Sequence, residues 1–425
     1  MKRIAIVDGI RTPFCKANGL IKEMGADDLG AYAVKELFLR SYLSPDKIDE
    51  VILGNVLQPS HATNIARVVS VKSGLSNKIP AYTINRNCAS GMEAVVSGAN
   101  KILLDEAEII LAGGVESMSN FPVLFPNSMR DFLQGMNKAR SFKERLFAFL
   151  KFRPSMLSPY IPPIGDPLCG LSMGETAENL SHDFKITREE QDIFALNSQM
   201  KAAKAIKEGI FKEEIVPIPL PKDYQKYQEV DDGPRFHTTY EGLSQLKPAF
   251  KKVNGTVTAG NSSPVTDGAA VLLLMNENKA KELGLKPLGF LIDFAEAALD
   301  PSRMGLGPAY ATAKLFKKTG FTLKDIDLIE INEAFASQVL AVMRAFASSE
   351  FAKQHLDQDI PLGEIDPNIL NVNGGAIALG HPLGASGTRL ILTLLKELKR
   401  RNKKRGLATL CVGGGQGQAC IVEVE

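Results

Sequence analysis

Short apolar segments alternate with longer segments of helical periodicity near both ends of the chain. Residues 51–53 and 109–112 are continuously apolar in the first part, and residues 408–412 are nearly so in the last part. Strands that are apolar throughout are usually buried on both faces of a sheet. Their alternation with helical segments is typical of sheets packed between layers of helices. The pattern therefore predicts an α/β protein.

The two ends of the chain also resemble each other. Residues 46–55 correspond to 324–332, and each copy is predicted to be a helix end followed by a buried strand. Residues 83–91 correspond to 370–387, where a strand leads to a helix start made of small residues. In both copies a helix and a strand ending in Gly-Gly follow. We interpret the chain as a duplicated α/β domain; two unrelated α/β domains are the alternative.

The middle of the chain does not follow this repeat. A helical pattern runs from 187 to 207, and Thr187 and Glu190 have the spacing of a capping box at its start. We interpret the middle as an insertion on the first copy. The predicted division is an N-terminal half at 1–120 and 250–278, an inserted loop domain at 121–249, and a C-terminal half at 279–425.

One part of the insertion, residues 130–153, is both basic and rich in Phe and Leu. It contains seven basic and two acidic residues, and Phe142, Leu146, Phe149 and Leu150 fall on one helical face. A basic amphipathic helix of this kind can lie on an anionic membrane or on a partner protein. The alternative is an ordinary surface helix packed on its own domain.

Composition excludes several classes of protein. The 425 residues are 44% hydrophobic, and 50 basic residues nearly balance 48 acidic ones, so nothing in the net charge supports nucleic-acid binding. The five cysteines form no CxxC pair, which argues against a disulfide framework or a zinc module and indicates a reducing compartment. No signal peptide or membrane-spanning segment is evident. We expect a cytoplasmic protein, with membrane contact at most peripheral.

Three residues that can carry chemistry, Cys88, His381 and Cys411, each lie in a separate glycine-rich segment. A cysteine nucleophile needs a nearby base, an environment that favours thiolate, and backbone donors for an oxyanion. Cys88 lies just before the helical pattern at 92–103, where the helix dipole favours the thiolate. A buried structural cysteine is the alternative.

His381 precedes Pro382 and is surrounded by glycines, which indicates a close approach of the backbone to another group. An imidazole there can take a thiol proton or stabilise an oxyanion; a hydrogen-bonded core histidine is the alternative. Asn332 follows the apolar residues 329–331, where its amide can hold a water or a carbonyl oxygen, or close a turn.

Cys411 ends an apolar strand in the second copy and corresponds to Leu111 in the first. Duplicated halves usually pack about a local twofold axis, which can bring corresponding positions together. A second thiol beside Cys88 can then act as a general acid and base, and the amides of Gly413–Gly415 can serve as oxyanion donors. A buried strand cysteine before a glycine turn is the alternative.

Together these segments resemble the thiolase family. The matching pieces occur in the family's order over nearly the whole chain; they are 87–91, 113–118, 173–178, 258–263, 332–335, 380–382 and Cys411 with its glycines. The resemblance implies a thiolase-like duplicated five-layer α/β/α/β/α fold with an inserted loop domain. It also implies a homodimer or tetramer, coenzyme A as cosubstrate, and neither a metal nor a permanently bound cofactor.

Carried over position by position, the resemblance makes Cys88 the nucleophile that becomes acylated and His381 its activator and the donor to the enolate oxygen. Asn332 would position a water in that first oxyanion hole, and Cys411 would move the proton on and off acetyl-CoA or CoA. The amides of Cys88 and Gly413 would form the second oxyanion hole. The implied CoA contacts are Ser263, Phe335 and Met173.

The resemblance implies a 3-ketoacyl-CoA thiolase of fatty-acid β-oxidation acting on acyl-CoA substrates. Ser172 and the basic insertion resemble the thiolase subunit of fatty-acid oxidation complexes, which would make a hydratase/dehydrogenase subunit a partner. Asn332 departs from the histidine frequent in that subgroup, and Gln416 stands where Met is frequent. The alternatives are an acetoacetyl-CoA thiolase and a catalytically silent thiolase-like protein that binds a membrane or partner.

Overall fold

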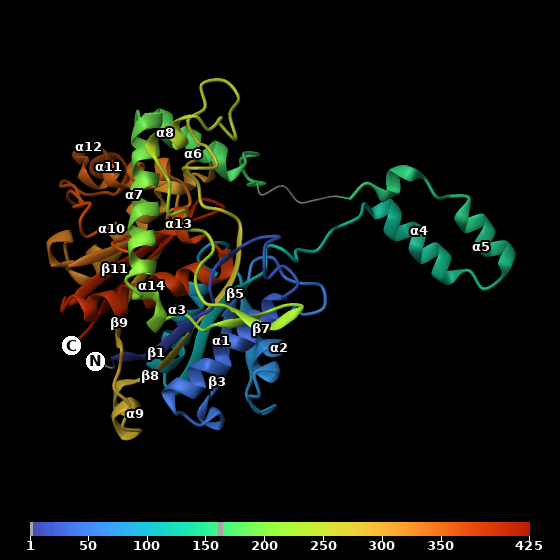
Figure 1. Ribbon diagram of the computed structural model, residues 1–425, viewed down its shortest axis with the longest axis horizontal. Helices are drawn as coiled ribbons and strands as arrows, with labels where there is room; N and C mark the ends of the chain where they lie inside the picture. Colours follow the sequence, from blue (N-terminus) through green and yellow to red (C-terminus); the bar gives the residue numbers. More distant parts are fainter. Residues whose placement is uncertain (1–2, 160–164) are drawn as a thin grey trace.

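The computed structural model describes residues 3–159 and 165–425, and its centre is one ten-stranded sheet (Figure 1). In spatial order the main path is β10 (Leu328–Ile331), β11 (Arg405–Val412), β12 (Gln416–Glu423), β9 (Gly289–Ala298), β1 (Ile4–Arg11), β8 (Thr266–Asn276), β5 (Ile109–Glu116), β3 (Glu50–Gly54) and β4 (Ala81–Ile84). The two-residue β2 (Cys15–Lys16) pairs with β8, and β6 (Ile218–Leu220) pairs with β7 (Asp223–Gln228) in a separate hairpin.

The two ends of this sheet repeat one pairing pattern. In the N-terminal half, β1 and β8 are antiparallel, β8 and β5 are antiparallel, and β5 and β3 are parallel. In the C-terminal half, β9 and β12, β12 and β11, and β11 and β10 follow the same sequence of directions. Among the described residues, the one strand ladder between the halves is the pairing of Ile4–Ile6 of β1 with Gly289–Leu291 of β9, and Ser262 and Phe335 add an isolated bridge. The predicted duplication is therefore confirmed.

Three layers of helices enclose the two halves of the sheet, and a hydrophobic cluster fills each interface. The outer layers are α1 (Ala26–Ser41) with α2 (Ile65–Lys72) on the N-terminal half and α10 (Gly307–Thr319) with α11 (Ala336–Ala347) on the C-terminal half. The central layer is α3 (Ser90–Leu103) and α14 (Leu383–Arg400), whose side chains pack on strands of both halves. This arrangement confirms the predicted five-layer fold.

The remaining helices belong mostly to the insertion and the connections. They are α4 (Asn127–Lys138), α5 (Phe142–Phe149), α6 (Met173–Asp183), α7 (Arg188–Lys207), α8 (Tyr240–Ser244), α9 (Glu277–Glu282), α12 (Ser349–His355) and α13 (Ala376–Leu379). The helix predicted at 187–207 is α7, and its capping box of Thr187 and Glu190 is confirmed. Short 3-10 helices occupy Pro45–Lys47, Pro154–Leu157, Ile210–Glu213, Pro301–Leu306 and Leu323–Asp325.

The basic, Phe-rich part of the insertion forms a helical hairpin, α4 and α5, that projects away from the rest of the molecule (Figure 1). Helix α5 buries none of its residues, and Phe142 and Leu150 are 81% and 70% exposed. The alternative of a helix packed on its own domain is therefore wrong. No helix among residues 3–159 and 165–425 is long and apolar enough to cross a membrane.

A buried ion cluster ties the insertion to the sheet. Arg11, the last residue of β1, is fully buried and holds Asp231 through two hydrogen bonds of 2.6 and 2.8 Å. Its Nε donates to Glu214 Oε1 over 2.7 Å, and Thr393 of α14 also donates to Glu214. Two carboxylates thus compensate one buried cation, and all of them come from different parts of the chain.

Replacing Asp231 with Asn should destabilise the protein strongly. Breaking a buried, hydrogen-bonded ion pair costs about 3–5 kcal/mol. Glu214 still pairs with Arg11 Nε, but both terminal nitrogens of the guanidinium lose their charged partner, so we expect a loss near the lower end of that range. The matched control is Asp131→Asn, which removes the exposed pair with Arg130 and should change the free energy of unfolding by less than about 1 kcal/mol. Urea unfolding followed by circular dichroism measures both; equal midpoints for the two variants would contradict the role of the cluster.

Candidate active site

The three glycine-rich segments converge on one cavity of about 220 Å³ at the N-terminal ends of the central helices. Cys88, His381 and Cys411 all line it, as do the three predicted CoA contacts, Met173, Ser263 and Phe335. Most of the remaining lining is apolar, including Met118, Phe250, Val265 and Met304. The two other predicted site residues do not line the cavity: Asn332 Nδ2 lies 3.3 Å from His381 Nε2, and the Gly413 amide lies near the Cys88 sulfur.

Cys88 lies between β4 and α3, two residues before the helix begins. The backbone amides of Gly413 and of Cys88 itself lie near its sulfur and favour the thiolate. The expected lowering of its pKa is nevertheless wrong: burial raises the pKa of the Cys88 thiol to about 11 and outweighs these two amides. The side chain is half-buried in the wall of the cavity. At neutral pH it is a thiol, so a reaction at this sulfur requires a base.

His381 lies on the short connection between α13 and α14 and is buried. Its Nδ1 is 2.6 Å from Ser386 Oγ, and that hydroxyl donates its own proton to the Pro382 carbonyl. The hydroxyl therefore accepts from Nδ1–H, which leaves Nε2 unprotonated and 3.3 Å from Asn332 Nδ2. Burial, and then the charge of Arg389, lower the pKa of His381 to about 3. The imidazole is thus neutral, with Nε2 free to accept a proton.

Asn332 follows β10 and is fully buried. Its Nδ2 contacts His381, whereas its Oδ1 has no hydrogen-bond partner among the described residues. A buried amide oxygen normally has a partner. A water donating to this oxygen would satisfy it and would lie beside the imidazole.

Cys411 lies near the end of β11, opposite Gly417 of β12, and is 1% exposed. Burial raises the pKa of the Cys411 thiol well above its ordinary value, and negative charge on Cys88 raises it further. The two sulfurs are therefore close enough for their charges to interact. Because each thiolate disfavours the other, the cavity favours at most one negative sulfur at a time.

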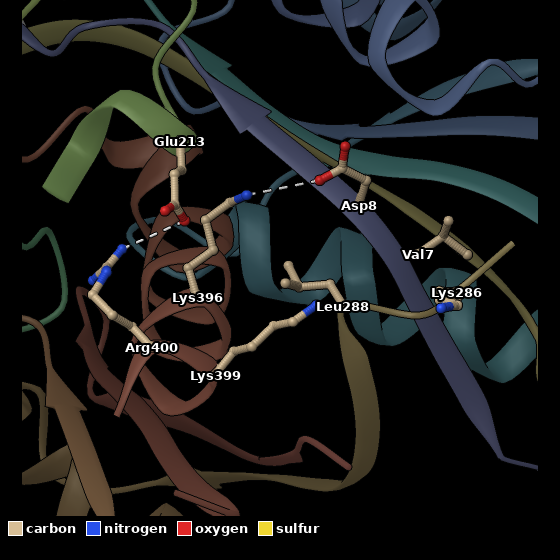
Figure 2. Close-up of a pocket in the computed structure, with 8 residues that line it drawn as sticks. All are labelled: Val7, Asp8, Glu213, Lys286, Leu288, Lys396, Lys399 and Arg400. Atoms are coloured by element: carbon tan, nitrogen blue, oxygen red, sulfur yellow. Dashed lines mark ion pairs between the residues drawn. The ribbon is translucent and has the colours of Figure 1, made fainter. Parts of the chain in front are cut away.

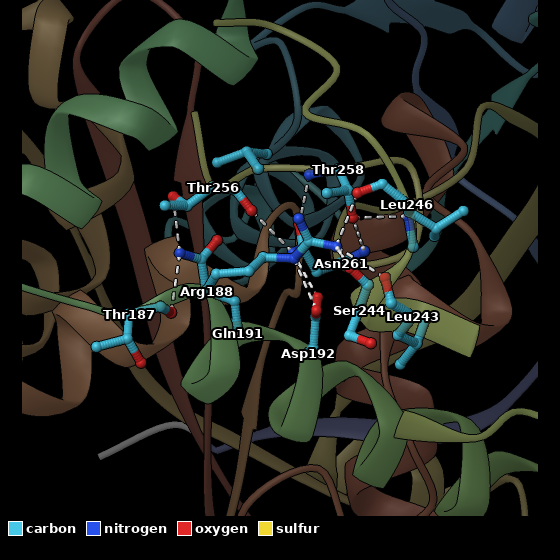
Figure 3. A network of polar contacts seen from close by, with 12 residues as sticks. Thr187, Arg188, Gln191, Asp192, Leu243, Ser244, Leu246, Thr256, Thr258 and Asn261 are labelled. Carbon is cyan, nitrogen blue, oxygen red and sulfur yellow. Dashed lines mark hydrogen bonds and ion pairs between the residues drawn. The ribbon is translucent and has the colours of Figure 1, made fainter. Parts of the chain in front are cut away.

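The loop that supplies Ser262 and Ser263 is held by α7 (Figure 3). Asp192 accepts hydrogen bonds from Arg188 Nε over 2.7 Å and from Asn261 Nδ2 over 2.9 Å, while Asn261 Oδ1 accepts from the Thr258 amide. The same loop then exchanges backbone hydrogen bonds with residues 334 and 336. The insertion thus fixes the cavity wall contributed by Ser263 and Phe335.

Sequence reasoning missed three residues beside the reactive groups. Ser386 orients the His381 ring, and its position five residues later in the same glycine-rich segment was an available signal. Asn87 donates to the Gly413 carbonyl, and its only signal is that it precedes Cys88. Asp166 accepts from the Gly414 amide, and nothing in its local sequence indicates this contact.

A larger cavity of about 390 Å³ lies at the other end of α14 and has a different character (Figure 2). Lys286, Lys396, Lys399 and Arg400 line it together with two carboxylates. The ion pairs between its lining residues are long, with Lys396 Nζ 3.8 Å from Asp8 and an Arg400 nitrogen 3.6 Å from Glu213. It contains neither a thiol nor an imidazole, so the chemistry belongs to the smaller cavity.

Comparison with known proteins agrees with this geometry. The family described as "Thiolase, N-terminal domain" matches residues 4–278, and "Thiolase, C-terminal domain" matches residues 285–424. A 3-ketoacyl-CoA thiolase of Yersinia enterocolitica is 42% identical over 424 residues, covering 100% of this chain and 97% of the relative. One of Serratia proteamaculans is 43% identical over 426 residues, with the same coverage.

Solved structures give the same result. The acetyl-CoA acetyltransferase of Bacillus anthracis superposes with a TM-score of 0.85 at 39% identity, covering 100% of this chain and 99% of that one. Human mitochondrial 3-ketoacyl-CoA thiolase in complex with CoA superposes with a TM-score of 0.84 at 38% identity, covering 100% and 98%. With family matches over both halves and relatives aligned along its whole length, this chain belongs to the thiolase family.

Proposed function

We propose that this protein is a 3-ketoacyl-CoA thiolase, an acyltransferase that cleaves 3-ketoacyl-CoA with CoA to acetyl-CoA and a shortened acyl-CoA. The observation that carries the proposal is the single cavity in which two thiols, a neutral imidazole and two sulfur-directed amides meet. The full-length similarity to curated 3-ketoacyl-CoA thiolases supports the same reaction. Coenzyme A is the cosubstrate, as the human relative solved with CoA supports.

The first half-reaction begins at Cys88. His381 Nε2 takes the thiol proton, and the sulfur attacks the 3-keto carbon of the substrate. The bond between C2 and C3 then breaks, and its electron pair becomes the enolate of acetyl-CoA. Cys411 gives this enolate a proton, so acetyl-CoA leaves and the shortened acyl group stays on Cys88 as a thioester.

The second half-reaction restores the enzyme. The Cys411 thiolate takes the proton of the incoming CoA thiol, and the CoA sulfur attacks the acyl group on Cys88. The Cys88 sulfur leaves and recovers its proton from His381. Burial holds His381 and both thiols neutral at rest, so the imidazolium of His381 and the thiolate of Cys411 exist only between the two half-reactions.

Two sets of donors suit the two kinds of oxyanion. The amides of Cys88 and Gly413 converge on the sulfur and suit the tetrahedral intermediates of acyl transfer. His381 Nε2, once protonated, and a water on the unpartnered Asn332 Oδ1 suit the enolate oxygen. Ser263, Phe335 and Met173 lie on the cavity wall, where they would contact CoA.

The finer assignments extend this proposal. We place the enzyme in fatty-acid β-oxidation in the cytoplasm, as a homodimer or tetramer with a hydratase/dehydrogenase subunit as its partner. The five free cysteines support a reducing compartment. The division into halves at 1–120 with 250–278 and at 279–425, around an insertion at 121–249, is supported by the repeated strand pairing.

A second candidate is an acetoacetyl-CoA thiolase. The close superposition with an acetyl-CoA acetyltransferase favours it, since that enzyme's name describes transfer of an acetyl group. Substrate length separates the two candidates, because both use the same reactive groups.

CoA-dependent cleavage of 3-ketoacyl-CoA substrates should therefore rise from four carbons to longer chains. Cys88→Ala should abolish turnover at every length, because no acyl-enzyme can form, and it serves as the blank. Loss of 3-ketoacyl-CoA absorbance measures the rate. Turnover confined to the four-carbon substrate would favour the second candidate, and no turnover at any length would refute both.

Cys411→Ala should separate the two thiols. The variant should still form an acyl-enzyme on Cys88 from an acyl-CoA, seen as a mass increase of the intact protein. It should lose exchange of the acetyl-CoA methyl protons with deuterated solvent by about a hundredfold or more, since the general base is absent. If Cys411→Ala failed to acylate while Cys88→Ala still did, the two roles would be reversed.

We further propose that the projecting hairpin of α4 and α5 lies on an anionic membrane. Its exposed aromatic and aliphatic side chains supply apolar area, and its cations supply attraction to acidic headgroups. Phe132 packs on Phe152 within the hairpin, with ring centroids 5.4 Å apart, so the hairpin has a small core of its own.

Removing three hairpin cations should weaken vesicle binding about a hundredfold, because each is worth about 1 kcal/mol at an anionic surface. Co-sedimentation with phosphatidylglycerol-containing vesicles measures this, and phosphatidylcholine vesicles should bind weakly. The control removes three cations at the far end of α14. The hairpin set is Arg140, Lys143 and Arg145 and the control set is Lys399, Lys403 and Lys404, each replaced by Gln. Equal binding by both variants would exclude the membrane contact.

A further inference from the structure

The backbone amide of Gly413, the proposed oxyanion donor, belongs to a loop of three glycines that has no side chains to anchor it. Gly413, Gly414 and Gly415 follow β11, and the last two have φ values of +88° and +73°. Three successive glycines lose the most conformational entropy on ordering, and they have no side chains that packing could fix. The direction of the Gly413 amide therefore depends on contacts from elsewhere in the chain.

Those contacts hold the peptide unit between Gly413 and Gly414 at both ends. Asn87 Nδ2 donates to the Gly413 carbonyl oxygen over 2.8 Å, and the Gly414 amide donates to Asp166 Oδ2 over 2.8 Å. Because the peptide unit is planar, two bonds on its opposite sides fix its plane. That plane restricts the backbone at Gly413, whose own amide lies near enough to the Cys88 sulfur to favour the thiolate.

Asp166 is itself rigidly placed. It is 3% exposed, and its Oδ1 accepts from the Leu168 amide over 2.8 Å. Its backbone amide donates to the Leu171 carbonyl, and its carbonyl accepts from the Gly170 amide. An antiparallel bridge between Gly165 and Ser172 closes this small loop. The residue after the bridge partner, Met173, already lines the cavity, so this small loop is continuous with the cavity wall.

We infer that Asp166 and Asn87 are positioning residues, which aim the Gly413 amide at the oxyanion formed on Cys88. The inference rests on the proposed thiolase function and extends it. Asp166 comes from the insertion and Asn87 from the N-terminal half, whereas the donor belongs to the C-terminal half. The oxyanion hole is therefore assembled from all three parts of the chain, and neither copy of the duplication contains it alone.

The test compares the turn at Asp166 with a similar turn at Asp366. Asp366 also precedes a proline and accepts from the amide two residues later, over 2.9 Å, but it is exposed and contacts no part of the glycine loop. Asp166→Asn keeps the size and one acceptor oxygen, Asp166→Ala removes both acceptors, and Asp366→Asn and Asp366→Ala are the controls.

At saturating substrate, we expect kcat for thiolysis to fall about tenfold in Asp166→Asn and about a hundredfold in Asp166→Ala, with KM changed less than about threefold. Alkylation of Cys88 by iodoacetamide should slow much less than thiolysis, because it loses only the effect of the Gly413 amide on the thiolate and forms no oxyanion. Hydrogen–deuterium exchange of the peptide covering 411–417 should accelerate in both Asp166 variants. Both Asp366 variants should match the wild type in all three measurements.

The readouts separate the inference from the function on which it rests. Wild-type turnover with unchanged kcat in the Asp166 variants would overturn the positioning role and leave the thiolase proposal intact. Equal losses in the Asp366 variants would also overturn it. If the wild type showed no turnover, the proposed function would fail, and unchanged exchange at 411–417 would independently overturn the positioning of the loop.

Discussion

The structure depends on the contact between the N-terminal ends of α3 and α14. The two helix backbones touch there through Gly91 and Gly384. A Cβ atom added at Gly91 would lie 2.5 Å from the Gly384 carbonyl oxygen, so the backbones approach as closely as they can. The buried carboxylate of Glu116, at the end of β5, accepts hydrogen bonds from the amides of Gly384, Val56 and Leu57. This contact brings the cysteine before one helix and the histidine before the other into one cavity.

The fold was largely predictable because its strand segments and its repeat can be seen in the sequence. The glycine-rich segments that carry the thiols and the imidazole can be seen there too, but their meeting in one cavity is shown by the structure. Apolar segments predict strands, the capping box at Thr187 predicts the start of a helix, and the repeat predicts the duplication. The pKa of Cys88 was predicted in the wrong direction, because the sequence shows the helix start but not the depth of burial that outweighs it. Asp166 and the Arg11 cluster were missed because their partners lie far along the chain. The sequence also did not predict that α4 and α5 project from the molecule, because an amphipathic pattern does not show what its apolar face packs against.

The cavity disfavours charged side chains in the resting protein. Its lining is mostly apolar, so ionising either sulfur or the imidazole is unfavourable in the resting protein. Donors are nevertheless in place where negative charge would develop, at the amides of Gly413 and Cys88. A site of this kind stabilises a transient oxyanion more than any stable ion, and it offers little to a free water molecule that would compete with CoA for the acyl group.

The narrow junction between the two halves of the sheet has a consequence for how the molecule comes apart. Among the named strands of the described residues, only Ile4–Ile6 and Gly289–Leu291 pair across the halves, whereas α3 and α14 share one hydrophobic cluster with strands of both halves. Neither half can keep its inner face covered once the other has unfolded. We therefore expect the two halves to unfold as one cooperative unit. Although the repeat divides the sequence into two halves, neither half should be stable alone.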